Sequence, residues 1–236
     1  MSNPYFQFKH FTVFHDKCAM KVGADGVTLG AWADVQNAKT ILDVGCGSGL
    51  IALMLAQRSE AKITAIDIDE NCALQAKENI ENSPWKSRIS VLHTSFQDFA
   101  TKTTETYDLI VSNPPFFNNS LKNPLQSRSI ARHSETLPHV DLVKNAKKIL
   151  SDNGKLCVIL PVVEGERFIE LAENEGLFCK QKVNVFPNHE KAAKRLLLEF
   201  KKKKSDCKIS ELTIEKERGI YTDEYSELVK DFYLKL

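Results

Sequence analysis

The chain has 236 residues, of which 42% are hydrophobic and 27% charged, and its formal net charge is +1; these values are typical of one globular domain. No window approaches the roughly 18 apolar residues of a membrane span, and residues 1–5 lack the segments of a secretion signal, so we expect one cytoplasmic domain over residues 1–236. The cysteines form no Cys-x-x-Cys pair and have no histidine at metal-ligand spacing, which argues against a metal site and predicts free thiols.

The first elements are predicted to be short. Phe6, Phe8 and the apolar residues between Phe11 and Phe14 indicate short strands. A glycine-rich turn and a short helix that runs through Trp32 are expected to follow. Residues 1–38 are therefore expected to form an N-terminal extension.

From residue 38 onward, short apolar runs alternate with helical patterns, which is typical of βαβ units and a parallel sheet. The predicted strands are Thr40 to Val44, Lys62 to Asp67, Ile89 to His93, Tyr107 to Ser112 and Lys155 to Leu160. The predicted helices are Leu50 to Arg58, Glu70 to Glu81 and Val140 to Leu150, with Gly154 ending the last of them. We therefore expect a doubly wound α/β fold.

The last third of the chain predicts the remaining edge of the sheet. After a helix around Glu166 to Asn174, two long apolar runs, Phe178 to Phe186 and Arg195 to Lys201, are joined by a polar loop. They indicate an antiparallel pair, which makes a mostly parallel, seven-stranded sheet with an antiparallel last strand. A short strand near Leu212 to Ile214 and a helix from Asp223 to Leu234 are expected after it.

Three glycines follow the first of the five strands, in Asp43-Val44-Gly45-Cys46-Gly47-Ser48-Gly49. They permit positive φ angles and close backbone approach, which predicts a ligand where the strand turns into a helix. The spacing from Gly47 to Ala52 also satisfies Gly-x-Gly-x-x-Ala, so a dinucleotide site stays open. Asp43 favours S-adenosylmethionine, because a carboxylate suits a cationic amino-acid group better than a pyrophosphate.

Three residues beyond this loop are candidates for the adenosine part of such a cofactor. Asp67 ends the second strand, where a carboxylate can accept hydrogen bonds from both ribose hydroxyls. Ile68 can cover one face of the adenine, and Asp98 can accept a hydrogen bond from the adenine amine. Asp98 fits a helix N-cap equally well, and for Asp69 the cap interpretation is favoured.

The step Asn113-Pro114-Pro115-Phe116 ends the fourth strand and predicts the chemistry. The exocyclic amine of adenine is a poor nucleophile because its lone pair is delocalised into the ring, so an enzyme must favour the localised form. The Asn113 side-chain oxygen and the Pro114 carbonyl oxygen can each accept one N–H, and Phe116 can stack on the base. The prolines stiffen this arrangement. The alternative is a surface turn, which the upstream glycine loop disfavours.

These motifs resemble the bacterial tRNA (adenine-N6)-methyltransferases that modify adenine 37 in a valine tRNA, within the class I S-adenosylmethionine-dependent methyltransferases. The matching segments are His15 to Gly23, Asp25-Gly26, Leu29 to Trp32, Asp43 to Gly49, Leu53 to Arg58, Ser83 to Trp85, Asn113 to Pro115 and Phe232 to Leu234. The resemblance implies that residues 1–38 lie over the cofactor, with Lys21 and Asp25 at its amino-acid end. Ala24 stands where the family has Thr, and Phe116 where it often has Tyr.

The resemblance also implies a tRNA partner, whose single-stranded anticodon loop can splay adenine 37 into a pocket. Basic residues gather between residues 180 and 208 and after the Asn-Pro-Pro step. The candidates for phosphate contacts are Lys122, Arg128, Arg132, His133, Lys194, Arg195, Lys201 and Lys202. Their alternative is a solvated surface without a partner.

Three other functions remain open from the residues alone. Protein glutamine N5-methyltransferases and other nucleic-acid amino-methyltransferases share an Asn-Pro-Pro-aromatic step, although the front segment argues against glutamine as the substrate. The Gly47 fingerprint would also suit a dinucleotide-dependent oxidoreductase. A tRNA-binding scaffold without activity is the third.

Overall fold

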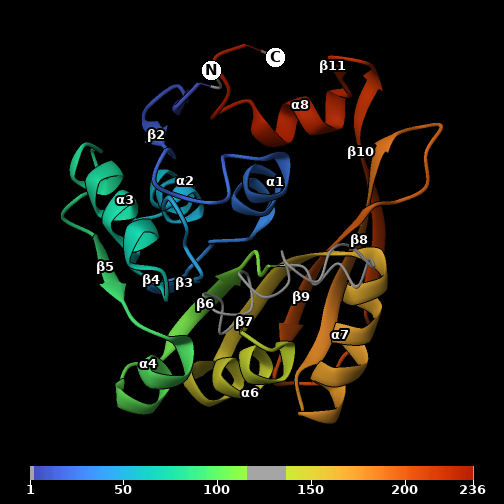
Figure 1. Cartoon of the computed structure of the whole chain (residues 1–236). Helices are drawn as coiled ribbons and strands as arrows, with labels where there is room; N and C mark the ends of the chain where they lie inside the picture. Colours follow the sequence, from blue (N-terminus) through green and yellow to red (C-terminus); the bar gives the residue numbers. More distant parts are fainter. Residues whose placement is uncertain (1–2, 116–136, 236) are drawn as a thin grey trace, which may run out of the picture.

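The structure is a computed structural model that describes residues 3–115 and 137–235. A β-sheet crosses its centre (Figure 1). The strands of this sheet are β3 (Thr40–Val44), β4 (Lys62–Asp67), β5 (Ile89–His93), β6 (Tyr107–Ser112), β7 (Leu150–Pro161), β8 (Phe178–Asn188), β9 (Arg195–Lys201), β10 (Lys208–Glu217) and β11 (Ile220–Tyr221). Within the described residues the strand order is β11-β10-β8-β9-β7-β6-β3-β4-β5.

The pairing of these strands confirms the doubly wound, mostly parallel sheet. β5, β4, β3, β6 and β7 are parallel to one another, and β9 is antiparallel to both β7 and β8. Two strands extend the sheet beyond the seven expected, because β10 pairs in parallel with β8 and β11 pairs with β10. The sequence indicated only a short strand here, since Leu212 is the single buried residue of β10.

Helices cover both faces of the sheet (Figure 1). One face carries α1 (Ala24–Trp32), α2 (Leu50–Arg58), α3 (Glu70–Glu81) and α8 (Asp223–Val229), and the other carries α4 (Phe96–Lys102), α6 (His139–Ile149) and α7 (Val162–Asn174). A separate hairpin, β1 (Tyr5–Gln7) with β2 (Thr12–Phe14), precedes α1. A helix at α4 was implied only by the cap alternative for Asp98, and α8 ends at Val229 instead of Leu234.

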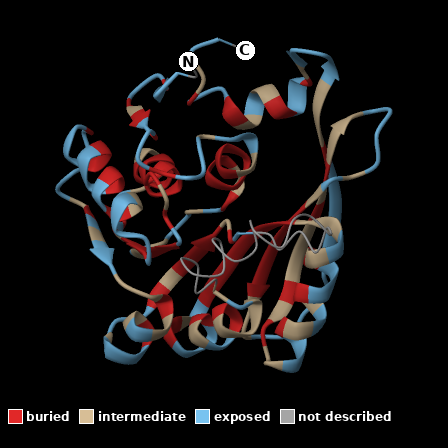
Figure 2. Ribbon diagram, in the orientation of Figure 1, coloured by how far each residue is buried: buried red, intermediate tan, exposed pale blue. Residues whose placement is uncertain are grey.

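Each face of the sheet has its own hydrophobic core, which Figure 2 shows as buried strands between partly exposed helices. Alternate residues of a strand point to opposite faces, so Ile41 of β3 joins one core while Leu42 and Val44 join the other. Gly154 lies inside β7 and does not end α6; a Cβ there would stand 2.6 Å from the Tyr107 carbonyl oxygen. This glycine therefore permits close packing of β7 against β6.

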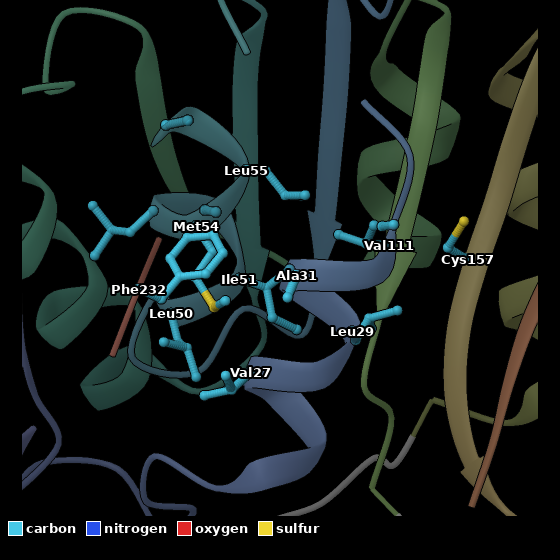
Figure 3. Close-up of a cluster of buried hydrophobic side chains, with 14 of the residues drawn as sticks. Val27, Leu29, Ala31, Leu50, Ile51, Met54, Leu55, Val111, Cys157 and Phe232 are labelled. Carbon is cyan, nitrogen blue, oxygen red and sulfur yellow. The ribbon is translucent and has the colours of Figure 1, made fainter. Parts of the chain in front are cut away.

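α1 packs closely on α2 through two glycines, within the cluster drawn in Figure 3. A Cβ at Gly30 would stand 2.8 Å from the Met54 sulfur, and one at Gly26 would stand 3.1 Å from Leu50. The Arg58 guanidinium donates to the carbonyl oxygens of Gly30 and Ala33 at 2.8 and 2.7 Å, which satisfies the end of α1. This contact fixes the extension beside the helix that follows the glycine loop.

Among the helices in the described parts of the chain, none combines the length and the hydropathy that a membrane span requires.

Candidate active site at the carboxyl edge of the sheet

The predicted site residues gather where β3, β4 and β6 end. These strands are parallel, so their carboxyl ends share one edge of the sheet, and the strand order reverses between β3 and β6, where α/β sheets bind ligands. The Ser112 hydroxyl donates to the Val44 carbonyl oxygen at 2.9 Å and joins the two strand tips. A hollow of about 870 Å³ lined by Asp34 and Arg58 lies at the opposite edge and contains none of the predicted site residues.

The glycine loop has the backbone geometry that its sequence predicts. Gly45, Gly47 and Gly49 have φ angles of 71°, 54° and 79°. An added Cβ at Gly45 or Gly47 would meet no atom within 4 Å, whereas one at Gly49 would stand 3.2 Å from the Cβ of Ala76. Gly49 is thus required for packing against α3, while Gly45 and Gly47 present bare backbone to open space that a ligand can fill.

Asp67 supports this loop from the end of β4. Its Oδ2 accepts a hydrogen bond from the Gly47 amide at 2.8 Å, and its Oδ1 accepts one from the Asp69 amide at 2.9 Å. Burial raises the pKa of this carboxyl. Each carboxylate oxygen keeps a second lone pair, so ribose hydroxyls can still bind.

The two residues expected near the adenine lie on the next segments of this edge. Ile68 is 44% exposed although it is apolar, and Asp98 is exposed in the first turn of α4. The N-cap of α4 is Ser95, whose hydroxyl accepts from the Asp98 amide at 3.0 Å, so the cap alternative for Asp98 is wrong. Asp69 is the N-cap of α3 as expected, and its side chain accepts from the amides of Asn71 and Cys72.

Asp43 lies fully buried beneath the glycine loop. Its Oδ2 accepts from the Ala52 amide at 3.0 Å, whereas its Oδ1 is buried with no hydrogen-bond partner among the described residues. Burial, with a smaller contribution from the nearby charge of Asp67, raises the pKa of this carboxyl to about 7. An unpartnered buried acceptor fits a cationic donor, and the ammonium group of S-adenosylmethionine is such a donor.

His15 holds the segment before α1, and an ion pair holds the first turn of α1. The His15 ring accepts from the Val22 amide at 3.4 Å and donates through Nε2 to the Asn3 carbonyl oxygen at 3.0 Å, which closes the segment that contains Lys21. Asp25, in the first turn of α1, accepts from Arg195 Nε at 2.7 Å. The structure therefore joins a residue expected at the cofactor to one expected at the RNA.

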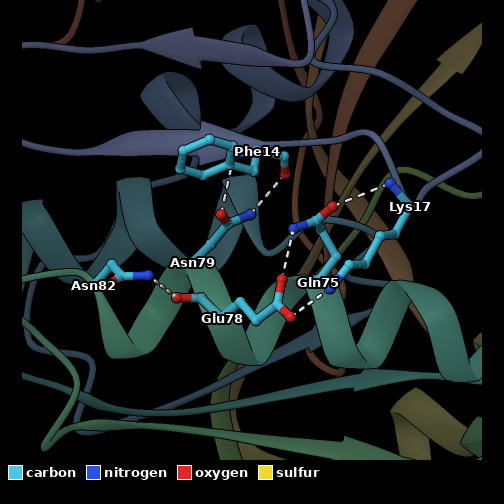
Figure 4. A network of polar contacts seen from close by, with 6 residues as sticks. All are labelled: Phe14, Lys17, Gln75, Glu78, Asn79 and Asn82. Carbon is cyan, nitrogen blue, oxygen red and sulfur yellow. Dashed lines mark hydrogen bonds and ion pairs between the residues drawn. The ribbon is translucent and has the colours of Figure 1, made fainter.

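Two buried amides of α3 hold the segment before α1, and neither was expected from the sequence (Figure 4). Asn79 accepts from the Phe14 amide at 3.0 Å and donates to the carbonyl oxygens of Phe14 and Ser48 at 2.8 and 2.9 Å. Gln75 accepts from the Lys17 amide at 3.1 Å. Both side chains are 1% exposed, and the available signal was two amides four residues apart on one helix face.

Asn113 and Pro114 lie at the tip of β6. The Asn113 Oδ1 atom is buried and has no hydrogen-bond partner in residues 3–115 and 137–235, and Pro114 is buried beside it. A buried amide oxygen without a donor is costly unless a ligand supplies one. Phe116 lies outside the described residues, as do Lys122, Arg128, Arg132 and His133.

The remaining basic candidates fall into two groups at opposite edges of the sheet. Arg195 begins β9 opposite Pro161, the last residue of β7, so Lys194 and Arg195 lie at the carboxyl edge with the site. Lys201 pairs with Lys155, six residues before Pro161 in β7, and six residues of strand span about 20 Å. Lys201 contacts Glu199, and Lys202 donates to the Leu150 carbonyl oxygen at 2.7 Å. The basic residues expected to contact RNA are therefore divided between two edges of the sheet, because β9 separates its two ends.

Within the described residues, no group of three or more His, Cys, Asp or Glu side chains could hold a metal ion.

Comparisons with known proteins agree with this geometry. The methyltransferase small domain family matches residues 29–172. A predicted O-methyltransferase of Agrobacterium tumefaciens has the same fold, with a TM-score of 0.68 at 20% identity over 88% of this chain and 96% of that one. A 16S rRNA N2 methyltransferase of T. thermophilus, solved with AdoMet and guanosine, gives a TM-score of 0.58 at 19% identity over 84% of this chain and 50% of that one.

Fold and site together define an S-adenosylmethionine-dependent methyltransferase. A protein of Parabacteroides distasonis named tRNA1(Val) (adenine(37)-N6)-methyltransferase is 50% identical over 100% of both chains. The chain belongs to the tRNA1(Val) (adenine(37)-N6)-methyltransferase family. Because the chain belongs to this family, neither methylation of a protein glutamine nor dinucleotide-dependent oxidation is favoured as its function.

Proposed function

We propose that this enzyme transfers a methyl group from S-adenosylmethionine to the N6 amine of adenosine 37 in the anticodon loop of a valine tRNA. The observation that carries the proposal is the buried, unpartnered Oδ1 of Asn113 at the tip of β6. An exocyclic amine has two N–H groups, and this oxygen would accept one of them while the Pro114 carbonyl oxygen accepts the other. The family name of the relatives supports the position in the tRNA.

The described residues would act by positioning. S-adenosylmethionine, when bound, supplies an electrophilic methyl group and departs as a neutral thioether. Asp43 would bind the ammonium group of the cofactor, Asp67 its ribose, and Ile68 and Asp98 its adenine. The backbone of Gly45, Gly47 and Gly49 would lie against the cofactor. Asn113 and Pro114 would orient the lone pair of the target nitrogen toward the methyl group. Phe116 would stack on the target base.

Lys21 and Asp25, in the N-terminal extension, would complete the part of the site that binds the amino-acid end of the cofactor. We propose that residues 1–236 act as one domain in which residues 1–38 cover the cofactor. The contacts of Asn79 and Gln75 support this arrangement, because they join that extension to the glycine loop and α3.

The tRNA would contact the carboxyl edge of the sheet. We propose phosphate contacts at Lys194 and Arg195, and at Lys122, Arg128, Arg132 and His133 in the segment that follows the Asn-Pro-Pro step. A base in a single-stranded loop can leave its stack for only a few kcal/mol. The proposal places the enzyme in the cytoplasm with its tRNA and requires no protein partner and no metal.

The deciding experiment identifies the methylated nucleoside. The purified enzyme is incubated with methyl-labelled S-adenosylmethionine and unmodified valine tRNA, and the digested nucleosides are separated by mass spectrometry. We expect labelled N6-methyladenosine, and no label in a matched transcript with guanosine at position 37. Label in a co-purified protein, or the same label in the guanosine transcript, would overturn the proposal.

A further inference from the structure

A pair of cysteines lies close together at the edge of the sheet away from the site. Cys179 is in β8 and Cys207 directly precedes β10, and their sulfur atoms are 3.2 Å apart. Both are free thiols. A disulfide bond is about 2.05 Å long, so the sulfurs need to approach each other by only about 1.2 Å.

The backbone brings the two residues together. β8 and β10 are parallel neighbours that begin their register with Gln181 opposite Lys208, so each cysteine lies just before the first paired residue of its strand. Cys179 pairs with Phe200, near the end of β9 that lies farthest from Arg195. The pair is therefore remote from Asn113 and from the glycine loop.

The two thiols differ in accessibility. Cys207 is exposed, whereas Cys179 is 5% exposed. Burial, and then the hydrogen bond with Cys207, raise the pKa of the Cys179 thiol well above its ordinary range. A solute in the solvent therefore reaches Cys207 first, and Cys179 is placed to react second.

We propose that Cys179 and Cys207 form a reversible disulfide when the protein meets a hydroperoxide. The Cys207 sulfur attacks the terminal peroxide oxygen, which gives a sulfenic acid and an alcohol, or water when the oxidant is hydrogen peroxide. The Cys179 sulfur then attacks the sulfenic sulfur, and water leaves with the Cys179 proton. Two thiols are oxidised to one disulfide while one peroxide bond is reduced, and a dithiol reverses the change.

The bond would fasten β10 to the rest of the sheet. In the described residues β10 pairs with β8 on one side and with only the two-residue β11 on the other. β10 and β11 lead into α8, which packs on α1. A covalent link at the start of β10 closes a loop across 28 residues, which should oppose unfolding of this last part of the sheet.

The test maps the bond in the whole enzyme. The reduced protein is treated with stoichiometric hydrogen peroxide, blocked with a thiol alkylating agent and digested with trypsin without reductant. We expect titratable thiols to fall from six to four, and residues 168–180 to be found linked to residues 205–208. The oxidised protein should melt at a temperature higher by roughly 5 °C, and dithiothreitol should reverse this shift.

Two variants distinguish the Cys179–Cys207 disulfide from oxidation of other cysteines in the protein. Cys207→Ser should lose both the linked peptide and the melting shift, and it should keep the reduced protein's melting temperature because residue 207 is exposed. Cys72→Ser is the matched control, since the Cys72 thiol shares a hydrogen bond with Cys18 in the other close pair, and it should keep both effects. Linkage confined to Cys18 and Cys72, or a Cys207 that stops at the sulfenic acid with no thiol lost from Cys179, would overturn the proposal.

Discussion

The Asp25 carboxylate and the Arg195 guanidinium form an ion pair at 2.7 Å that joins the first turn of α1 to the start of β9. Both side chains are 29% exposed, so solvent weakens the pair to about 1 kcal/mol or less. Its importance lies in position, because it connects the segment proposed to cover the cofactor with the strand end proposed to meet the tRNA.

Replacing Arg195 should therefore affect the cofactor site as well as tRNA binding. We expect Arg195→Gln to weaken S-adenosylmethionine binding by about threefold to fivefold, because Asp25 loses the partner that orients it. Calorimetry without tRNA measures this effect. Asp25→Asn should weaken binding in the same direction, and the double variant should be no worse than the poorer single variant. Additive losses would show that the two residues act independently.

Asn113 should be needed for the methyl-transfer step and not for cofactor binding. Asn113→Ala removes the unpartnered acceptor at the tip of β6. We expect kcat to fall by about 10² to 10³-fold, as for the loss of one oriented hydrogen-bonding group in other active sites. Affinity for S-adenosylmethionine should stay within about threefold, because this side chain is proposed to face the substrate. Single-turnover methylation of tRNA measures the rate, and a rate near that of the wild type would reject the assigned role.

The sequence predicted those elements of the fold whose apolar residues lie in the two cores. β3, β4 and β6 begin and end at the expected residues because helices bury the sheet on both sides, and β5 does so although Ile89 is its single buried residue. β10 was underestimated since one of its faces stays exposed and only Leu212 is buried. Gly154 was placed wrongly, because its reason is a close contact with Tyr107 from another strand, which no local pattern reports.

Contacts between distant parts of the chain also limited the prediction of the site. The strand ends of Asp43, Asp67 and Asn113 could be predicted, since parallel strands bring their carboxyl ends to one edge. Asn79 could not, because its partners are backbone groups 65 and 31 residues away. The basic residues around β9 form one cluster in the sequence, whereas a strand carries its two ends to opposite edges of the sheet.

Asn79 should contribute to both stability and cofactor affinity. Asn79→Ala leaves the Phe14 amide and two carbonyl oxygens without their partner in a buried place, which should cost about 3 kcal/mol of unfolding free energy. Cofactor affinity should also fall, because Ser48 in the glycine loop loses its support. Asn82→Ala is the matched control at the C-cap of the same helix: its side chain is exposed and donates to the Glu78 carbonyl oxygen. Urea denaturation should show a change of at most about 0.5 kcal/mol for this control. Equal losses in the two variants would contradict the bridging role.

Asp43 should make the binding of S-adenosylmethionine release a proton. Its pKa of about 7 lies above the ordinary value of 3.8, so the folded protein without cofactor keeps this carboxyl protonated up to neutral pH. A bound ammonium group favours the carboxylate, and the proton must then leave. At pH 6.5 the binding heat should depend on the protonation enthalpy of the buffer, and the dependence should vanish above about pH 8 or in Asp43→Asn. Buffer-independent heats at pH 6.5 would exclude this role.

The same pKa gives the stability of the cofactor-free protein a pH dependence. Between pH 3.8 and about 7 the folded state binds more protons at Asp43 than the unfolded state does. This contribution therefore falls as pH rises through that window and is constant above it. Asp43→Asn should remove this part of the slope from urea titrations taken at pH 5, 6 and 7.

The amino-terminal end of β9, which lies at the carboxyl edge of the sheet, should bind tRNA phosphates, and the other end of β9 should not. Lys191 and Lys194 are exposed in the loop between β8 and β9, at the edge that carries Asn113. Replacing both with Gln should lower the slope of log Kd against log salt by about 1 to 2, because each phosphate contact releases bound counterions.

The control is the double variant Lys202→Gln with Lys203→Gln, which removes the same charge at the far end of β9. We expect an unchanged slope for this control in filter-binding titrations with unmodified tRNA. A larger change from the far pair would place the tRNA on the other edge of the sheet, where Asn113 could not reach its adenine.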